Sequence, residues 1–329
     1  MFGVNVRKNF LDYLLLGKKD RKVFCHSKKS GKCIGGRVSA PKNLIGKRVY
    51  LFTVDEIDKL RKYVATLESV KTFFRAILNS NNGSKMFSIV GETWNPISGC
   101  LHHCRYCWAR RLALTKLRDT RRYRNGFKPR LNEEEFRKRF KGGVVFVSDM
   151  GDIFSPGVED SWVIKVLRHI RKFPDTYFLF LTKNPTKYKD FLDLFPSNCI
   201  LGATIETNKD DLYIEYKISS APLPSIRYQA MKELDWPYKF VSIEPILDFD
   251  LDIFVRWIKE INPFMMYVGY DNYNNRLPEP PLRKTLRLIE KLNEFTLVIK
   301  KTIRPAWNEK ESILNYVGSG DRDRGEKKF

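Results

Sequence analysis

Val144-Val-Phe-Val147 is a short, fully apolar run, and the stretch that follows it, Ser148-Asp-Met-Gly-Asp-Ile-Phe154, begins with polar residues. The same pattern recurs down the chain at Tyr177–Leu181, Ile200–Ile205, Phe240–Ile243, Met265–Val268 and Leu297–Ile299. Segments whose apolar residues recur with the period of a helix lie between most of these runs, at Trp162–Ile170, Leu251–Ile261 and Leu282–Leu292. Continuous apolar strands that alternate with helices predict a parallel α/β sheet covered by helices. The number of units favours a complete or partial (β/α) barrel of TIM-barrel type, with a doubly wound open sheet as the alternative.

Polar side chains follow nearly every predicted strand. They are Ser148 with Asp149 and Asp152, Thr182 with Lys183, Glu206 with Thr207, Glu244, and Asp271. The carboxyl ends of barrel strands meet at one face, so we expect these side chains to surround a single site. Each one taken alone has a simpler interpretation, since polar residues after strands also cap the next helix.

The composition restricts the class of protein. The chain has 329 residues, of which 43% are hydrophobic and 30% are charged, so it can bury one large core or two modest ones. Disordered and fibrous classes are excluded. No apolar run approaches the roughly 20 residues of a membrane span, and Leu14-Leu-Leu16 is too short for a signal sequence. We expect a cytoplasmic protein that does not enter membranes.

The net charge of +22 is concentrated in two segments. Residues 1–82 hold 18 basic and 6 acidic residues, residues 105–141 hold 14 and 4, and the remainder is neutral overall. Such segments indicate a polyanionic partner, so a nucleic acid, DNA or RNA, is expected; a merely solvated basic face is the alternative. Aromatic residues that could stack on bases stand in the second segment: Tyr106, Trp108, Tyr123 and Phe127. The arginines expected to contact nucleic acid are Arg110, Arg111, Arg118, Arg121, Arg122 and Arg124.

Residues 1–82 are predicted to form a small basic α+β domain in front of the barrel. Short β-like runs such as Arg48–Phe52 precede a long amphipathic helix that spans Ile57 to Ile77. The polar stretch Asn79–Ser84 marks the boundary, so the barrel is expected over residues 83–305. Residues 306–329 form a polar extension that is expected to be partly disordered.

Three of the six cysteines lie close together, at Cys100, Cys104 and Cys107, in a C-x3-C-x2-C spacing. They lie between the first predicted strand, at Phe87–Val90, and a predicted helix. Three thiolates within eight residues can hold one soft metal centre. A zinc ion would need a fourth ligand, from His102, His103 or a distant residue, whereas a cubane iron–sulfur cluster would leave one iron open. The other cysteines fit simpler roles. Cys25 and Cys33, with His26, are half of a zinc knuckle or two free thiols, while Cys199 and His169 are expected to be structural.

The cysteine spacing, with Tyr106 in its aromatic position, resembles the C-x3-C-x-(aromatic)-C hallmark of the radical S-adenosylmethionine (SAM) superfamily. The lead-in Thr93-Trp-Asn-Pro-Ile-Ser-Gly-Cys100 resembles an uncharacterised phage and prokaryotic branch with a T-W-N-P-x-x-G-C motif. Further stretches look similar at Val145–Phe154, Leu181–Pro185, Gly202–Glu206 and Ser242–Leu247. The resemblance covers about residues 84–305 and implies a partial (β/α) barrel of radical SAM type.

The resemblance also implies roles for individual residues. Cys100, Cys104 and Cys107 would hold a [4Fe-4S] cluster, and SAM bound there would be cleaved reductively to methionine and a 5′-deoxyadenosyl radical. The remaining residues are expected to contact SAM: Tyr106 against the adenine, Ser148, Asp149 or Asp152 at the amino group, Lys183 at the carboxylate, Glu206 at the ribose, and Glu244 at SAM or substrate. The usual glycine-rich motif ending in Glu is missing, since Ser148-Asp-Met-Gly-Asp152 stands in its place.

Three functional hypotheses follow. The first is a radical SAM enzyme that modifies or repairs a nucleic acid or nucleotide, with electrons from a donor such as ferredoxin or flavodoxin. The second is a non-catalytic nucleic-acid-binding protein with a structural zinc site at the three cysteines. The third is a barrel that binds the cluster without turning over SAM, motivated by the missing Glu motif. The sequence identifies neither the substrate nor the oligomeric state.

Overall fold

The computed structural model describes residues 28–29, 32–33 and 87–309. In the N-terminal segment the described parts are two short antiparallel strands, β1 (Lys28–Lys29) and β2 (Lys32–Cys33). The rest of the predicted basic domain, with its helix at 57–77 and with Cys25 and His26, lies outside the described residues. So does most of the polar C-terminal extension, from residue 310 onward.

A seven-stranded sheet forms the centre of the described fold, and all of its strands run parallel. Its strands are β3 (Glu92–Trp94), β6 (Val144–Val147), β7 (Tyr177–Thr182), β8 (Cys199–Thr204), β9 (Lys239–Ile243), β10 (Met265–Val268) and β11 (Leu297–Lys300). Each of the six apolar runs noted in the sequence forms a strand. Buried parallel strands have both faces covered, which is why they read as continuous apolar runs.

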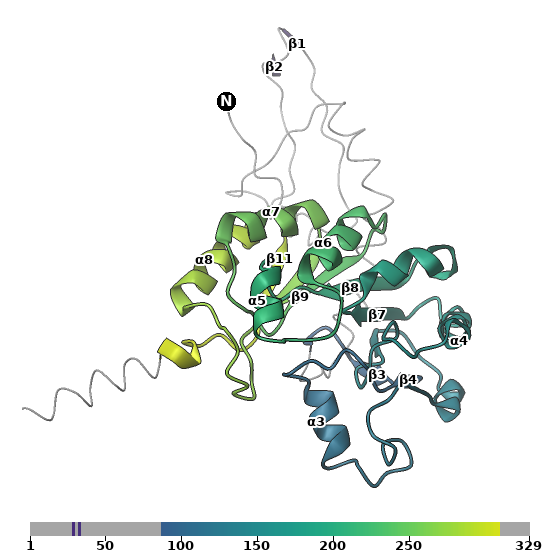
Figure 1. Cartoon of the computed structure of the whole chain (residues 1–329). Helices are drawn as coiled ribbons and strands as arrows, with labels where there is room; N and C mark the ends of the chain where they lie inside the picture. Colours follow the sequence, from purple (N-terminus) through teal and green to yellow (C-terminus); the bar gives the residue numbers. More distant parts are fainter. Residues whose placement is uncertain (1–27, 30–31, 34–86, 310–329) are drawn as a thin grey trace, which may run out of the picture. The chain divides into compact units, whose positions relative to one another are not determined.

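The strands are ordered consecutively across the sheet, from β3 through β6, β7, β8, β9 and β10 to β11. This order identifies the winding of a (β/α) barrel and contradicts the doubly wound alternative, in which the order reverses at a switch point. The sheet does not close, because β3 and β11 are its two edges and are not paired with each other. Figure 1 shows the sheet with its helices in chain order from α4 to α8.

Helices cover one face of the sheet. They are α4 (Asp160–Ile170), the 3-10 helix η3 (Pro185–Leu194), α6 (Pro224–Glu233), α7 (Leu251–Ile261) and α8 (Leu282–Asn293), with the short α5 (Asp210–Glu215) before α6. Successive helices of this layer contact one another, as right-handed crossovers in a consecutive sheet require. Alternate strand residues, such as Val145, Phe178, Val241 and Met266, pack with them into one core.

Aromatic side chains pack together on the opposite, inner face of the sheet. The Phe87 ring lies 5.5 Å from Phe146, 5.5 Å from Phe240 and 4.8 Å from Tyr267, measured between centroids. The sequence predicted a first strand at Phe87–Val90, and this is wrong, because β3 begins at Glu92. Phe87 is apolar because its ring packs in this inner cluster. An apolar run therefore indicates burial here and does not indicate a strand.

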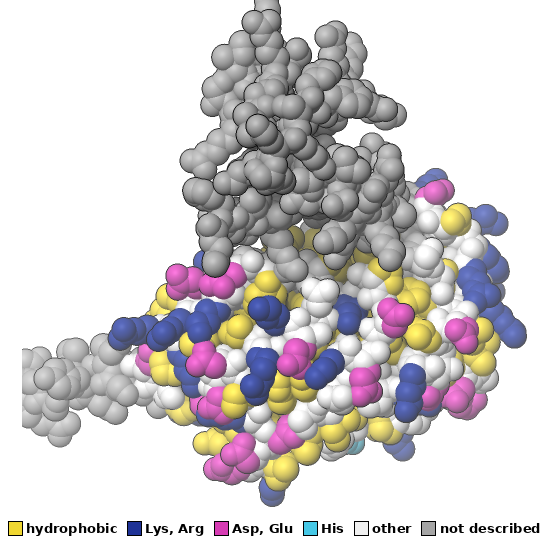
Figure 2. Space-filling model, turned by 90° about the horizontal axis from the view of Figure 1, so that it is seen from above, with side chains coloured by type: hydrophobic (Ala, Val, Ile, Leu, Met, Phe, Trp, Pro, Cys, Tyr) yellow, Lys and Arg dark blue, Asp and Glu magenta, His cyan; other side chains and the backbone are white. Residues whose placement is uncertain are grey.

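Charged side chains of both signs are interspersed on the face seen in Figure 2. This matches the neutral charge balance of the chain outside its two basic segments. Among the described residues, no helix has the length and apolar character that crossing a bilayer requires.

Candidate active site

The three cysteines lie on one loop between β4 (Ile97–Ser98) and α3 (Trp108–Leu114). Gly99 opens this loop, and its N–H donates to the Met150 carbonyl at 2.9 Å. Its φ of +85° is costly for a side chain, and an added Cβ would lie 2.1 Å from the Lys128 carbonyl oxygen. Only glycine therefore allows the chain to enter the loop here.

Hydrogen-bonding groups surround the three thiols, and two of the thiols accept a backbone N–H. The Cys100 Sγ accepts from the His102 N–H at 3.4 Å. The Cys107 Sγ accepts from the Arg110 N–H at 3.3 Å, so Cys107 also caps α3. The Cys104 Sγ lies 3.3 Å from the Ser219 hydroxyl. Donors directed at sulfur suit thiolate ligands, whose negative charge they stabilise.

The segment after α5 holds the cysteine loop from behind. The Arg105 N–H donates to the Ile218 carbonyl at 3.0 Å, and the Ser219 hydroxyl and Ser220 N–H both donate to the His102 carbonyl at 2.7 Å. No pattern in the sequence predicts this support, because the segment has no periodicity or motif. It fixes Cys104 against a second element of the barrel.

Burial raises the pKa of all three thiols above the ordinary value of 9.0. The Lys183 ammonium acts in the opposite direction on Cys104 and Cys107. The apo loop therefore favours protonated thiols, and a bound cation that draws off the protons would relieve the burial cost.

Among residues 87–309 and the two short strands, no group of three or more His, Cys, Asp or Glu side chains is arranged as a metal site. The donor set nevertheless fits a thiolate-bound centre, since three free thiols share one loop and two of them accept a backbone N–H at sulfur. A cationic neighbour, Lys183, is also close enough to oppose the thiolate charge.

Glu206 lies at the centre of a buried charge network beside this loop. Its side chain is fully buried, yet it accepts from Lys183 Nζ at 2.7 Å and from Arg227 Nη1 at 2.7 Å. Tyr106, between two of the cysteines, donates its hydroxyl to Glu206 as well. Burial raises the pKa of Glu206, but these partners outweigh it and bring the pKa down to about 2. The carboxyl is therefore charged at neutral pH, and it ties the cysteine loop to β8 and α6.

Arg227, which is fully buried on α6, was not predicted as a site residue. Its Nε donates to the Pro222 carbonyl and its Nη1 to the Thr204 carbonyl, both at 2.7 Å, and its guanidinium lies 4.9 Å from the Tyr213 ring centroid. A signal was present, because the buried residues of α6 are Pro224, Arg227 and Met231. An arginine in the apolar stripe of a helix requires a buried partner.

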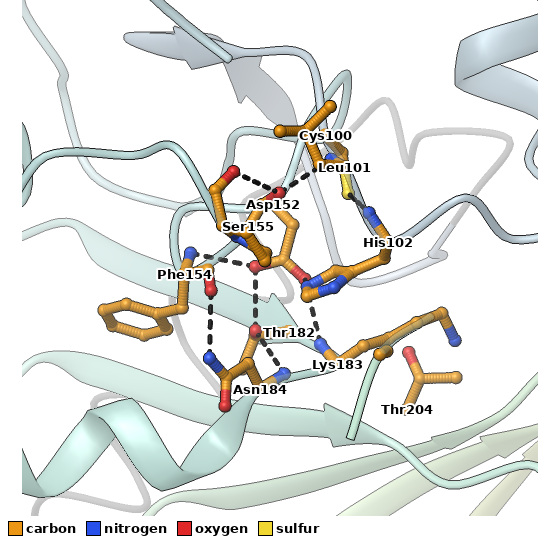
Figure 3. Close-up of polar contacts among 12 residues, drawn as sticks. Cys100, Leu101, His102, Asp152, Phe154, Ser155, Thr182, Lys183, Asn184 and Thr204 are labelled. Atoms are coloured by element: carbon orange, nitrogen blue, oxygen red, sulfur yellow. Dashed lines mark hydrogen bonds and ion pairs between the residues drawn. The ribbon is translucent and has the colours of Figure 1, made fainter. Parts of the chain in front are cut away.

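Asp152 organises the loop after β6, as Figure 3 shows. One carboxylate oxygen accepts from the Thr182 hydroxyl at 2.7 Å and the Phe154 N–H at 2.9 Å. The other accepts from the Lys183 N–H at 2.9 Å and lies 3.2 Å from His102 Nε2. Although burial raises its pKa, His102 and these donors lower it below the ordinary value. Asp152 thus joins the cysteine loop to the end of β7.

The remaining predicted SAM contacts occupy three different surroundings. Asp149 accepts from the Asn95 amide at 2.6 Å, and burial raises its pKa. Ser148 is buried with a φ of 61°, and its hydroxyl has no partner in the part of the chain that the structure describes. Glu244 accepts from Lys301 Nζ at 2.7 Å, and burial raises its pKa against that cation. Only Tyr106, Lys183 and Glu206 are in mutual contact.

The basic segment after the cysteines is partly engaged in ion pairs. Arg122 lies 2.9 Å from Glu135 and 3.1 Å from Glu134. Arg118 contacts Asp119 with both side chains mostly exposed. Arg111, Arg121 and Arg124 are exposed, and Arg110 is half-buried. Several of the predicted arginines are therefore open to a ligand.

The structure contradicts the expected stacking role of two aromatic residues in this segment. Tyr123 and Phe127 are 5% and 7% exposed and pack on each other at 6.2 Å in a small core under α3. Trp108 packs against the same core, and Tyr106 is bonded to Glu206. These aromatic residues stand among charged residues in the sequence because their side chains pack inward and anchor the basic segment.

No curated protein matches the chain significantly. Among solved structures, spore photoproduct lyase with bound AdoMet and dinucleoside spore photoproduct is 11% identical, with a TM-score of 0.43 over 69% of this chain and 72% of that chain. SuiB of Streptococcus suis bound to S-adenosylmethionine is 13% identical, with a TM-score of 0.42 over 77% of this chain and 54% of that chain.

One family model matches residues 86–259, more than half of the chain, and its description is "Protein of unknown function (DUF5131)". The matched range includes the cysteine loop, Asp152, Lys183, Glu206 and Arg227. It also includes the lead-in Thr93–Cys100. The chain therefore belongs to the DUF5131 family.

Proposed function

We propose that this protein is a radical SAM enzyme that holds a [4Fe-4S] cluster on Cys100, Cys104 and Cys107. The observation that carries the proposal is the placement of three thiols on one loop, tied through Tyr106 to the buried carboxylate of Glu206. The resemblance of the C-x3-C-x2-C spacing and its lead-in to the superfamily adds to it. With the cluster and SAM bound, the chemistry supplied would be reductive cleavage of SAM to methionine and a 5′-deoxyadenosyl radical.

The protein's own residues would hold and orient these groups. The N–H donors of His102 and Arg110 stabilise two of the thiolates. Lys183 has three N–H donors, of which Glu206 takes one, so the others can meet the SAM carboxylate. Glu206 keeps both Lys183 and Tyr106 in place, as a positioning residue. Ser148, Asp149 and Glu244 are proposed as further SAM contacts, from the ends of their strands.

The proposed substrate class is a nucleic acid. The segment 105–141 carries a net charge of +10 and begins within the cysteine loop. Arg111, Arg121 and Arg124 are exposed on and after α3, the helix that Cys107 caps. A concentrated positive segment next to a site attracts polyanions and raises their local concentration. Electrons would come from a carrier such as ferredoxin or flavodoxin.

The test is metal content and visible absorbance of anaerobically reconstituted full-length protein, followed by addition of dithionite and SAM. Wild type is expected to hold about four irons per chain and to form 5′-deoxyadenosine. Cys104→Ala is expected to lose both. Cys199→Ala is the matched control, since this thiol is also fully buried but lies in the helix-packed core, and it should keep the iron.

Other outcomes would overturn the proposal in distinct ways. One zinc and no iron would favour the structural zinc site, with a fourth ligand from His102, His103 or a distant residue. Iron without deoxyadenosine would favour a barrel that binds the cluster but does not cleave SAM.

A further inference from the structure

The loop after β10 crosses to α3 and so joins the two sides of the open sheet. Arg111 on α3 donates from Nη2 to the Asn275 side-chain oxygen at 2.9 Å. Its guanidinium carbon lies 4.9 Å from the centroid of the Tyr273 ring. α3 follows β3, which is one edge of the sheet, while β10 lies beside the other edge, β11. Figure 1 shows the loop after β10 beside α3.

This loop is held in one shape by its own contacts. The Asn275 N–H and side-chain amide donate to the two oxygens of Asp271, at 2.7 and 2.8 Å. Asp271 is itself buried. The Asn272 side chain accepts from the Thr302 hydroxyl at 2.6 Å. Tyr273 is thus presented from a fixed loop, which reduces the entropy lost when a ligand binds.

The Tyr273 ring remains 48% exposed although a guanidinium packs on it, and it is the most exposed aromatic side chain of the described residues. Basic residues stand on both segments that form the pair. Arg111 covers the ring and Arg110 precedes it on α3, while Arg276 lies in the same loop as Tyr273, with its guanidinium 5.2 Å from the Trp307 ring centroid. An exposed aromatic ring beside a guanidinium, with further positive charge around it, is the arrangement that stacks an unpaired base and neutralises its phosphates.

The position of this pair connects it to the site. The Arg111 N–H donates to the Cys107 carbonyl at 3.2 Å, so the platform begins one helical turn from the last cysteine. We propose that Arg111 and Tyr273 form a stacking platform for an unpaired base of single-stranded nucleic acid, next to the cysteine loop. This rests on the proposed function for its substrate class, while the stacking step needs neither cluster nor SAM. The exposed aromatic ring of the platform is therefore Tyr273, from the opposite side of the sheet, and not an aromatic residue of the basic segment 105–141.

The experiment measures binding of a fluorescent single strand of about 12 nucleotides to the full-length protein, by anisotropy at several salt concentrations. Tyr273→Ala is expected to weaken binding about tenfold. Tyr273→Phe keeps the ring and should bind like wild type. Leu286→Ala is the matched control, because it removes a comparably exposed apolar side chain, 43% exposed, from α8. Circular dichroism checks that each variant is folded.

A second oligonucleotide separates stacking from charge. It has the same backbone but abasic sites in place of its bases, so Tyr273→Ala should leave its binding unchanged. Arg111→Met should weaken both oligonucleotides and lower the salt dependence by about one ion. Equal binding of wild type and Tyr273→Ala to the normal strand would overturn the platform. Absence of binding by wild type would instead overturn the nucleic-acid substrate class, and the deoxyadenosine assay would still report on the radical SAM activity.

Discussion

Replacing Arg227 with Met tests the buried network on which the candidate site depends. The substitution keeps an unbranched side chain on α6 but removes the cation 2.7 Å from Glu206. Both side chains are fully buried, so water does not replace the lost partner. Lys183 and Tyr106 remain as partners of the carboxylate.

Two estimates of the free energy of unfolding lost in Arg227→Met agree. Removing one partner of a buried ion pair costs about 3–5 kcal/mol, because the other charge stays buried. The partners of Glu206 hold its pKa at about 2 instead of 4.5, which corresponds to roughly 3 kcal/mol of stabilisation of the charged form. That pKa is the net result after burial has raised it, and Arg227 is the largest of the contributions that lower it, so we expect a loss of about 3 kcal/mol in the free energy of unfolding. For a domain of this size this lowers the melting temperature by about 10 °C.

The assay is thermal unfolding of apo protein, followed by circular dichroism. The control is Arg118→Met, whose ion pair with Asp119 has both side chains largely exposed and is worth less than about 1 kcal/mol. A double variant, Arg227→Met with Glu206→Gln, removes the uncompensated charge and should recover part of the loss. If Arg227→Met and Arg118→Met have the same melting temperature, the network around Glu206 does not stabilise the fold.

Three further predictions concern the same site. Because the pKa of Glu206 is depressed, the stabilisation that this carboxylate contributes is complete above pH 4.5 and is lost as the pH falls toward about 2. The free energies of unfolding of wild type and Glu206→Gln, measured with urea at several pH values, should therefore converge over that range. Gly99→Ala should destabilise the fold far more than Gly126→Ala, since both glycines have φ near +85° but only at Gly99 does the added Cβ meet backbone, at 2.1 Å; equal urea midpoints would contradict this. Ser219→Ala removes the hydroxyl that donates to the His102 carbonyl at 2.7 Å and should lower the free energy of unfolding by about 1 kcal/mol, whereas an unchanged urea midpoint would show that this hydroxyl does not hold the cysteine loop.

The strands and most helices could be predicted from the sequence, because burial on both faces of a parallel sheet leaves a continuous apolar run. Val144–Val147 and Met265–Val268 were predicted with the same bounds that the structure gives β6 and β10. The exception, Phe87–Val90, is apolar for a different reason, since Phe87 packs on the inner aromatic cluster. Apolar character reports burial, and it does not report whether the backbone is extended.

The site was predictable where its residues follow strands and unpredictable where they come from helices and loops. Lys183 and Glu206 follow β7 and β8, and neighbouring strands bring them together. Arg227 and Ser219 reach the same place from α6 and from the segment before it. Tyr273 lies far along the chain, and only the folded loop brings it to Arg111. Contacts of this kind depend on the path of the connections, which no local pattern encodes.

The aromatic cluster around Phe87 has a kinetic consequence. It fills part of the inner face of the sheet with packed rings, so that part of the face is closed to a small ligand. In the proposed function, SAM bound at Lys183 would enter and leave past the rim formed by α3 and the loop after β10, which Arg111 and Asn275 join. A macromolecule seated on that rim would block this route. We therefore expect compulsory-order kinetics, in which the small ligand binds first and its products leave last.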